Sequence, residues 1–244
     1  MTRKILITGA SGRIGRLITR ELGRQYEFVL TDIRELDETH GFPFIQADLA
    51  DIEAIRPLCQ DIHTVIHLGA DPRTTAPWET LLPSNIIGPY NVLQAAYEAG
   101  CQRVIFASSI NAVSGYSPKL QIRPDMPVRP PNLYGATKAW GEAAARFYAD
   151  ELGLSCLCLR LGWVLPRNSQ QIRPDHNMLD IVLTYEDLVR LMAACLEAPP
   201  SVHFGIFHAL SNNRRNRLDI SETRRIIGYQ PQDDAFTIAE NPPS

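Results

Sequence analysis

A tyrosine and a lysine stand four residues apart in the segment N-L-Y-G-A-T-K, at Tyr134 and Lys138. Residues i and i+4 of a helix share one face, so the ammonium group can lie beside the phenolic oxygen. A phenol with an ordinary pKa of about 10 is a weak base at neutral pH, and a neighbouring positive charge favours the phenolate. The pair is therefore a candidate acid–base centre. Ser108 and Ser109, at the end of the preceding predicted strand, are candidates for the hydroxyl that assists it.

A glycine-rich turn, T-G-A-S-G-R-I-G, places Gly9, Gly12 and Gly15 directly after the first predicted strand and at the start of a helix. In a dinucleotide site the first glycine permits the tight turn, the second lets the backbone approach the pyrophosphate, and the third lets helix and strand pack closely. The pyrophosphate then meets the free N–H groups and the positive end of the helix dipole. This pattern predicts a nicotinamide dinucleotide as cofactor, and its oxidised ring would supply a second positive charge beside Tyr134.

An aspartate, Asp32, ends the second predicted strand, 17 residues after Gly15. This is near the spacing of about 20 at which a carboxylate accepts hydrogen bonds from the cofactor ribose. The carboxylate favours NAD over NADP because it repels a 2′-phosphate. Arg13 and Arg34 leave the choice open, since either could reach such a phosphate.

The elements that must position these residues alternate between short apolar runs and helical patterns. Strands are predicted at 4–7, 27–31, 44–46, 64–68, 103–107, 154–160 and 203–210. Helices are predicted at 12–22, 51–58, 79–99, 132–152, 184–198 and 221–229. The alternation indicates an α/β fold, a Rossmann-type doubly wound parallel sheet. We expect a single domain over residues 1–244, with 161–182 (a loop, by its lack of periodicity) and 211–244 forming a small C-terminal substrate-side portion.

Composition excludes several classes of function. A net charge of −3 argues against nucleic-acid and anionic-membrane partners. We find no apolar run near the ~18 residues of a membrane span and no secretory leader pattern. The five cysteines are scattered and the histidines lack ligand spacing, so we expect a cytoplasmic protein without a metal site.

Taken together, the chain resembles the extended short-chain dehydrogenase/reductase group, the NAD-dependent epimerase/dehydratase family. Beyond the two motifs above, A-D-L-A-D resembles the segment beside the adenine, H-L-G-A the turn beneath the cofactor ribose, and N-I-I-G-P-Y-N-V-L the helix whose first Asn supports the active site. From the motifs and this resemblance, the predicted cofactor-binding residues are Gly9, Ser11, Gly12, Arg13, Ile14, Gly15, Asp32, Ile33, Asp48, Leu49, Leu68, Gly69, Ala70, Asn85, Tyr134 and Lys138.

The family contains epimerases, dehydratases and dehydrogenases. Only 84 residues follow Arg160, which leaves little room for a nucleotide-sugar domain, and Ile110 and Asn111 stand where family dehydratases resemble one another in carrying an Asp-Glu pair. Within the family the chain most resembles the uronate dehydrogenases, which oxidise C1 of a hexuronate to an aldarolactone. That resemblance implies that Tyr134 takes the proton of the C1 hydroxyl, that Lys138 assists it and that Ser109 holds the same oxygen.

The resemblance also implies a set of substrate contacts. A carboxylate is best held by a bidentate arginine, for which Arg173 is the first candidate and Arg167 the second. Trp163 stands where these dehydrogenases carry a serine, and Asn111 where they carry a histidine. The predicted substrate-binding residues are Ser109, Asn111, Tyr134, Trp163, Arg173 and Arg73.

Two other functions remain open from the sequence. One is an epimerase that retains its NAD and returns the hydride to the other face of a sugar. The other is a non-catalytic dinucleotide sensor, although relatives of that kind lack the Tyr or the Lys that this chain keeps. By family resemblance, the helices at 79–99 and 132–152 would pair in a homo-oligomer, a dimer or larger.

Overall fold

Seven parallel strands form one sheet in the computed structural model, which describes residues 3–242. The strands are β1 (Lys4–Thr8), β2 (Glu27–Asp32), β3 (Phe44–Gln46), β4 (Thr64–His67), β5 (Arg103–Ser109), β6 (Ser155–Leu161) and β9 (Phe204–Ala209). Their order across the sheet is β3-β2-β1-β4-β5-β6-β9. The order reverses direction beside β1, as in a doubly wound sheet, and the predicted Rossmann-type fold is confirmed.

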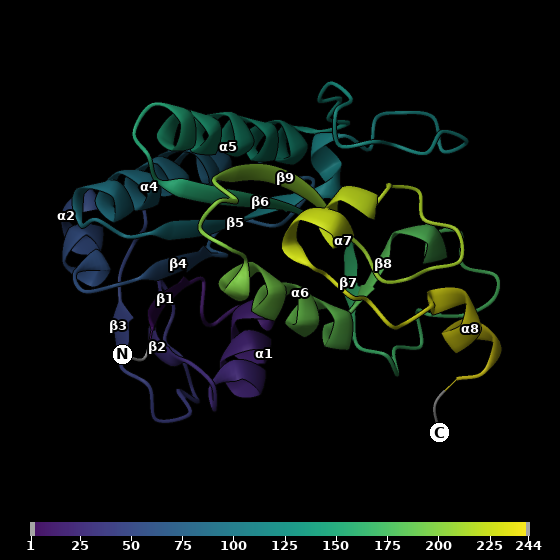
Figure 1. Ribbon diagram of the computed structural model, residues 1–244, viewed down its shortest axis with the longest axis horizontal. Coiled ribbons are helices and arrows are strands. Elements are labelled where there is room, and N and C mark those ends of the chain that lie inside the picture. The colour runs from purple at the N-terminus through teal and green to yellow at the C-terminus, as the bar shows by residue number, and fades with distance from the viewer. Residues whose placement is uncertain (1–2, 243–244) are drawn as a thin grey trace.

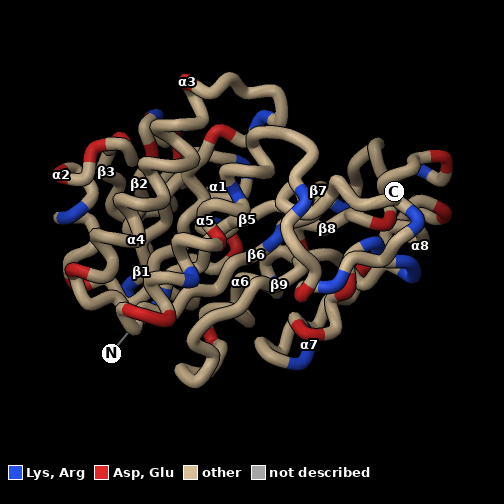
Figure 2. The backbone as a smooth tube through the Cα atoms, turned by 90° about the horizontal axis from the view of Figure 1, so that it is seen from above, with Lys and Arg blue, Asp and Glu red and all other residues tan. Residues whose placement is uncertain are grey.

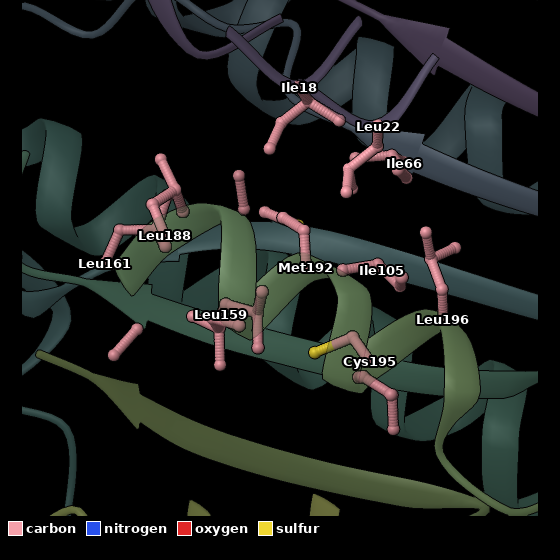
Figure 3. Packing of buried hydrophobic residues seen from close by; sticks show 14 of the residues in the cluster. Ile18, Leu22, Ile66, Ile105, Leu159, Leu161, Leu188, Met192, Cys195 and Leu196 are labelled. Carbon is pink, nitrogen blue, oxygen red and sulfur yellow. The ribbon is translucent and has the colours of Figure 1, made fainter. Parts of the chain in front are cut away.

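Helices cover both faces of the sheet (Figure 1). One face carries α1 (Arg13–Leu22) and α6 (Tyr185–Glu197), and the other carries α2 (Ile52–Ile55), α4 (Gly88–Glu98) and α5 (Leu133–Asp150). Because side chains alternate along a strand, Ile5 and Ile7 join the core under α1 and α6, and Leu6 joins the opposite core. Figure 3 shows α6 packing Leu188 and Met192 against the sheet beside α1. The sheet is thus buried on both faces, as its near-continuous apolar strands require.

Local signals explain where several helices begin and end. Thr184 caps α6, its hydroxyl accepting a hydrogen bond from the N–H of Asp187 at 3.2 Å. The short helix α7 (Ser221–Ile227) ends at Gly228, whose φ of +71° gives the left-handed turn that glycine adopts without strain.

The predicted helix at 79–99 is broken into three parts. A short α3 (Trp78–Leu81) leads into a π-helical segment, η2 (Leu82–Ile87), and α4 follows. Pro83 and Pro89 lie in these segments and lack the N–H that a continuous helix needs. The break shifts the register of the following turn, and Asn85 lies buried in the π-helical part.

The prediction that 161–182 is a loop was wrong in part. This segment contains β7 (Trp163–Leu165) and η4 (Leu179–Ile181), and β7 pairs with β8 (Val182–Thr184) in a second, two-stranded sheet. Three-residue strands are too short to show periodicity. A further helix, α8 (Ala235–Glu240), packs against η4 in a small separate core. Among the described residues, no helix is long and apolar enough to cross a membrane.

Candidate active site

A cleft of about 910 Å³ opens at the carboxyl ends of the central strands. This is the edge where open parallel sheets bind ligands. Most residues predicted from the sequence meet there: Gly9, Gly12, Arg13, Ile14, Gly15, Asp32, Ile33, Asp48, Leu49, Leu68, Gly69, Ala70, Arg73, Ser109, Asn111, Tyr134, Lys138 and Trp163 all line it. The glycine-rich turn and the Tyr-Lys pair, more than 100 residues apart in the chain, thus share one cavity.

The glycine-rich turn is built so that no side chain fills its concave side. Gly9 has a φ of +72°, and a Cβ placed there would lie 2.6 Å from the backbone nitrogen of Gly69. At Gly15 a Cβ would lie 2.7 Å from Cα of Ala10, so helix α1 could not approach the strand with any larger residue. At Gly12 the nearest atom to such a Cβ is the Gly9 oxygen, at 3.1 Å. Backbone can therefore reach a ligand at the start of α1, as a pyrophosphate requires.

Asp32 holds this turn in place from the end of β2. One carboxylate oxygen accepts a hydrogen bond from the Ser11 N–H at 3.0 Å, and the other accepts one from the Arg34 N–H at 3.1 Å. The guanidinium of Arg34 lies 3.9 Å from the same carboxylate and is mostly exposed. The buried Ser11 hydroxyl has no hydrogen-bond partner among the described residues. A glycine-rich turn that lines the cleft at the start of α1, with a carboxylate beside it, fits a dinucleotide with free ribose hydroxyls.

Tyr134 and Lys138 lie in the first part of α5, which Asn132 caps by accepting a hydrogen bond from the Gly135 N–H at 2.8 Å. Gly135 packs against the backbone of Asn111, where a Cβ would clash at 2.2 Å from its oxygen, so the helix starts directly against the end of β5. Burial raises the pKa of the Tyr134 phenol, the adjacent Ser109 hydroxyl works in the opposite direction, and the charge of Asp71 adds to the rise. The protein groups alone therefore keep this phenol protonated at neutral pH.

Lys138 is almost fully buried, and its Nζ lies 5.1 Å from the centre of the Phe106 ring and 5.7 Å from that of Tyr134. Burial lowers its pKa to about 8. The ring of His67 stacks on the ring of Phe106, which Lys138 also contacts. Burial, followed by the charge of Lys138, lowers the pKa of His67 to about 3. His67 is therefore neutral and lies outside the cleft lining, as expected of a packed residue.

The two serines at the end of β5 have different partners. Ser108 donates a hydrogen bond to the carboxylate of Glu142 at 2.6 Å, inside the protein. Ser109 accepts hydrogen bonds from the N–H of Asn111 at 3.1 Å and from its amide group at 3.2 Å. Both line the cleft, but it is Ser109 that lies beside the Tyr134 phenol. The geometry thus favours Ser109 as the hydroxyl that works with Tyr134.

An aspartate that the sequence reasoning missed, Asp71, also lines the cleft. Arg73 donates to it through Nε at 3.0 Å and Nη2 at 2.6 Å, and Thr80 through its hydroxyl at 3.0 Å. The hydrogen bond from the Arg73 guanidinium is the main reason that the pKa of Asp71 is lowered to about 2. Its position directly after H-L-G-A was the available signal. The cleft therefore contains a carboxylate and an arginine already joined to each other.

Three predicted site residues do not line the cleft: Ser11, Asn85 and Arg173. Asn85 lies behind the wall, where its amide accepts from the Asp71 N–H at 2.8 Å and donates to the Thr137 hydroxyl at 3.2 Å. It joins the Asp71 loop to the helix of Tyr134 and so positions the site without touching a ligand there. Arg173 pairs with Asp175, its alternative Arg167 pairs with Asp233, and neither arginine lines the cleft.

Comparisons with known proteins agree with this geometry. The sequence profile of the NAD dependent epimerase/dehydratase family matches residues 5–185. The chain is 34% identical to NAD-dependent glucose-6-phosphate dehydrogenase of Haloferax volcanii, over 99% of this chain and 98% of that protein. It is 29% identical to L-arabinose 1-dehydrogenase (NAD(P)(+)) of the same organism, over 97% of this chain and 99% of that protein. Among solved structures, a mutant uronate dehydrogenase from Agrobacterium tumefaciens complexed with NAD superposes with a TM-score of 0.88 at 31% identity, covering 100% of this chain and 92% of that one.

Proposed function

Because the chain belongs to the NAD-dependent epimerase/dehydratase family, as its motifs predicted, we propose that it is an NAD-dependent dehydrogenase that oxidises C1 of a sugar or hexuronate to the lactone. The observation that carries this proposal is the meeting of Tyr134, Lys138 and Ser109 with the glycine-rich turn in one cleft. The named relatives, which act on glucose 6-phosphate, arabinose and uronate, support a sugar substrate.

The residues of the cleft fit NAD as the cofactor. The turn of Gly9, Gly12 and Gly15 would receive the pyrophosphate, and Asp32 the hydroxyls of the adenosine ribose. Asp48, Leu49 and the exposed Ile33 would surround the adenine. Leu68, Gly69 and Ala70 would lie along the nicotinamide half. In this arrangement NAD supplies one thing to the reaction, an acceptor for the hydride that leaves C1.

The protein's own groups would handle the proton. Tyr134 takes it from the C1 hydroxyl, and Ser109 donates a hydrogen bond to the same oxygen. The cationic form of Lys138 favours the phenolate, which burial opposes. Asn111, fixed by its bonds to Ser109 and Asn132, would hold a further sugar hydroxyl. Trp163 offers a flat apolar face at the same end.

Charge at the substrate end bears on the choice of sugar. Among the arginines that line the cleft, Arg73 is the one that belongs to the predicted substrate contacts, and Asp71 already binds it in a bidentate manner. A uronate carboxylate would have to share Arg73 with Asp71. The hydroxyls of a neutral sugar could instead accept hydrogen bonds from Arg73 and donate them to Asp71 while the two stay paired. The hexuronate of our sequence prediction therefore remains one of several candidates.

The function is tested by following reduced nicotinamide absorbance after mixing the protein with NAD and a panel of sugars. The panel contains galacturonate, glucuronate, galactose, glucose, arabinose and glucose 6-phosphate. We expect stoichiometric NADH formation with at least one of them, and none from the matching 1-O-methyl glycoside, which lacks the C1 hydroxyl. Conversion of a sugar to its epimer with no net NADH would instead establish the NAD-retaining epimerase and contradict the proposal.

Asp32→Ala is expected to weaken NAD binding by about 10- to 100-fold, because hydrogen bonds to a charged carboxylate contribute about 1.5–3 kcal/mol. Affinity for NADP should fall less or rise, since the repulsion of a 2′-phosphate is removed while Arg13 and Arg34 remain. Calorimetric titration with both nucleotides measures this. Asp37→Ala removes an exposed carboxylate that pairs with Arg16 and serves as the control. Unchanged affinities for both nucleotides in Asp32→Ala would remove Asp32 from the cofactor site.

Two further features support an oligomeric, cytoplasmic enzyme. Tyr90 and Tyr97 of α4, and Trp140 and Phe147 of α5, are exposed apolar side chains on the two helices predicted to pair with a second copy. The five cysteines are all buried and unpaired, which suits a reducing compartment. Light scattering should give about twice the mass of one chain, and Phe147→Glu should reduce it to a single chain if this face is the interface. A wild-type monomer would contradict the dimer.

A further inference from the structure

A second cavity of about 490 Å³ lies among the C-terminal loops. Its walls come from the loop before α5, from the segment that precedes β8, from the loop after β9, and from α8. It shares no lining residue with the active-site cleft. In Figure 2, basic positions gather beside β8 and α8 together with some acidic ones.

Cations outnumber carboxylates on the walls of this cavity. Lys119, Arg215 and Arg217 line it, against a single carboxylate, Asp180. Within the described residues, Lys119 and Arg215 form no ion pair, in contrast to most arginines of the C-terminal half. The cavity therefore has an excess of two positive charges. Burial raises the pKa of Asp180, and the charge of Arg217 works in the opposite direction.

Arg217 is fixed in the wall without having all of its hydrogen bonds satisfied. Its Nη2 donates to the carbonyl oxygens of Ser114 at 3.2 Å and Tyr116 at 2.9 Å. Its backbone N–H donates to the backbone carbonyl oxygen of Asp180 at 3.1 Å. Its buried Nε–H has no acceptor in the described part of the chain. Arginines held by backbone carbonyls in this way keep a charge that a bound anion can neutralise.

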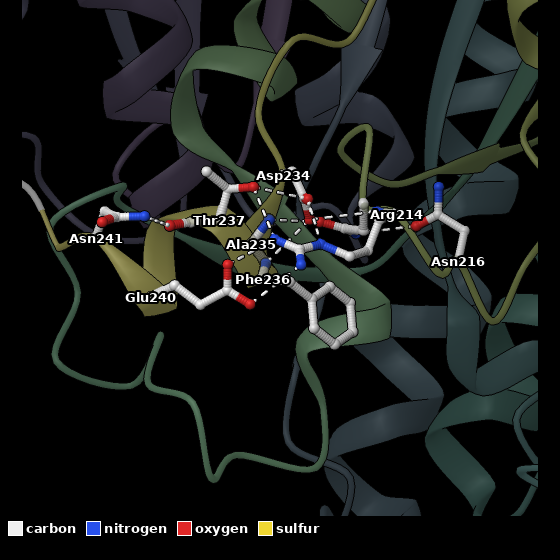
Figure 4. A network of polar contacts seen from close by, with 9 residues as sticks. Arg214, Asn216, Asp234, Ala235, Phe236, Thr237, Glu240 and Asn241 are labelled. Atoms are coloured by element: carbon white, nitrogen blue, oxygen red, sulfur yellow. Dashed lines mark hydrogen bonds and ion pairs between the residues drawn. The ribbon is translucent and has the colours of Figure 1, made fainter.

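A network of polar contacts holds the opposite wall in place (Figure 4). Arg214 donates to the Asp234 carboxylate at 2.9 Å, to the Thr237 hydroxyl at 2.9 Å and to the Glu240 carboxylate at 3.0 Å. These bonds fasten α8 to the loop after β9. On the same wall, the Arg215 guanidinium lies over the ring of Phe236, 4.8 Å from its centre. The cationic wall is thus arranged before any ligand arrives, which lowers the entropic penalty of binding.

The cavity adjoins the active site through two rings in contact, which are tilted by 36° to each other. Trp163 lines the cleft and His176 lines the second cavity, and their ring centres lie 4.7 Å apart. The His176 ring is oriented by accepting a hydrogen bond from the Met178 N–H at 3.2 Å. An occupant of the second cavity would therefore contact His176, and His176 contacts Trp163, which faces the proposed substrate in the cleft.

We propose that this second cavity is a binding site for a phosphate group. A phosphate dianion balances the excess of two charges, and its oxygens can accept hydrogen bonds from Lys119, Arg215 and Arg217 together. The asparagine and glutamine side chains around them can bind hydroxyls that accompany the phosphate. The group is provided either by free phosphate or by a sugar phosphate. The proposal stands apart from the proposed dehydrogenase activity.

The test is calorimetric titration of the NAD-saturated protein with inorganic phosphate, because NAD fills the pyrophosphate site that would otherwise bind it. We expect binding by the wild type, and binding weakened at least about tenfold in Arg215→Ala and in Lys119→Ala. Arg225→Ala removes an exposed arginine of α7 outside the cavity and should bind phosphate as the wild type does. Failure of the wild type to bind at millimolar phosphate, or equal binding by all four proteins, would overturn the proposal.

Titration with glucose 6-phosphate and with glucose then identifies the source of the phosphate group. If the cavity serves a sugar phosphate, glucose 6-phosphate will bind more tightly than inorganic phosphate, and Arg215→Ala will remove that advantage while leaving glucose unaffected. If it serves free phosphate, inorganic phosphate will bind at least as tightly as the sugar phosphate, with the same loss in Arg215→Ala. A sugar phosphate whose binding is unchanged by both cavity variants binds elsewhere, and if inorganic phosphate is also bound equally by the wild type and both variants, the proposal is contradicted.

Discussion

Tyr134→Phe is expected to lower turnover by roughly 10²- to 10⁴-fold while NAD binds nearly as it does to the wild type. The substitution removes only the phenolic oxygen, which is the group proposed to take the proton from the C1 hydroxyl. The ring remains, so the packing of α5 against the end of β5 and the contact with Lys138 are kept. The loss should fall on kcat more than on the binding of either ligand.

The large effect follows from how little else in the cleft can act as the base. His67 lies outside the cleft, and burial lowers its pKa to about 3. Asp71 is a weak base because its hydrogen bond with Arg73 lowers its pKa to about 2. Burial raises the pKa of Tyr134, so the phenolate has to be favoured by Lys138 and by the positive ring of the cofactor. Without the phenol, neither His67 nor Asp71 is an acceptor of suitable pKa for this proton.

Kinetics of NADH formation together with NAD titration check this prediction. Tyr90→Phe makes the same chemical change at an exposed tyrosine of α4 and should leave turnover unchanged. If Tyr134→Phe turned over at the wild-type rate with any sugar that the wild type oxidises, Tyr134 would not be the base and the mechanism would have to be abandoned.

Residues close in sequence account for most of what could be predicted. The buried parallel strands are apolar runs that can be read directly, and the glycine-rich turn and the Tyr-Lys pair are each local motifs. Placing both motifs at the same edge of the sheet follows from the rule that open parallel sheets bind ligands at their carboxyl ends. This is why the cleft contains most of the residues that the sequence suggested.

The parts that escaped prediction depend on contacts between distant residues. Nothing local shows that Trp163–Leu165 pairs with a strand 19 residues later. The break of the helix predicted at 79–99 is an exception, because Pro83 and Pro89 were a local sign of it. Arg173 was chosen for its type, but an arginine in an aperiodic loop has no signal that fixes its direction, and it pairs with Asp175. Asp71 was overlooked because its significance lies in Arg73 and Thr80, which bind it only after folding.

A buried ion pair beneath the active site, between Glu142 of α5 and Arg160 of β6, was likewise invisible in the sequence. Arg160 donates to the two oxygens of the carboxylate through Nε and Nη2, both at 2.8 Å, and each side chain is about 2% exposed. Ser108 donates to the same carboxylate at 2.6 Å. His208 lies 3.4 Å from Nη1 of Arg160, and burial followed by the arginine charge lowers its pKa to about 4, so it is neutral at neutral pH and can accept that bond.

Glu142→Gln should lower the free energy of unfolding by about 3–5 kcal/mol, because it leaves the buried Arg160 cation without its counter-charge. Glu27→Gln makes the same change at an exposed glutamate of β2 and should alter stability by less than about 0.5 kcal/mol. Denaturant unfolding of the two variants and the wild type gives both values. A loss in Glu142→Gln no larger than in Glu27→Gln would show that the pair contributes little to the fold.

The double variant Glu142→Met, Arg160→Met separates the charge effect from packing. Buried ion pairs replaced by apolar residues of similar size often keep or regain stability, so the double variant should be more stable than Glu142→Gln. It also leaves Ser108 without its acceptor, next to Ser109 in the catalytic strand. We therefore expect the double variant to fold yet to turn over more slowly than the wild type, with its loss in kcat rather than in NAD affinity. Full activity in a stably folded double variant would show that the ion pair serves the fold alone and has no part in positioning the serines.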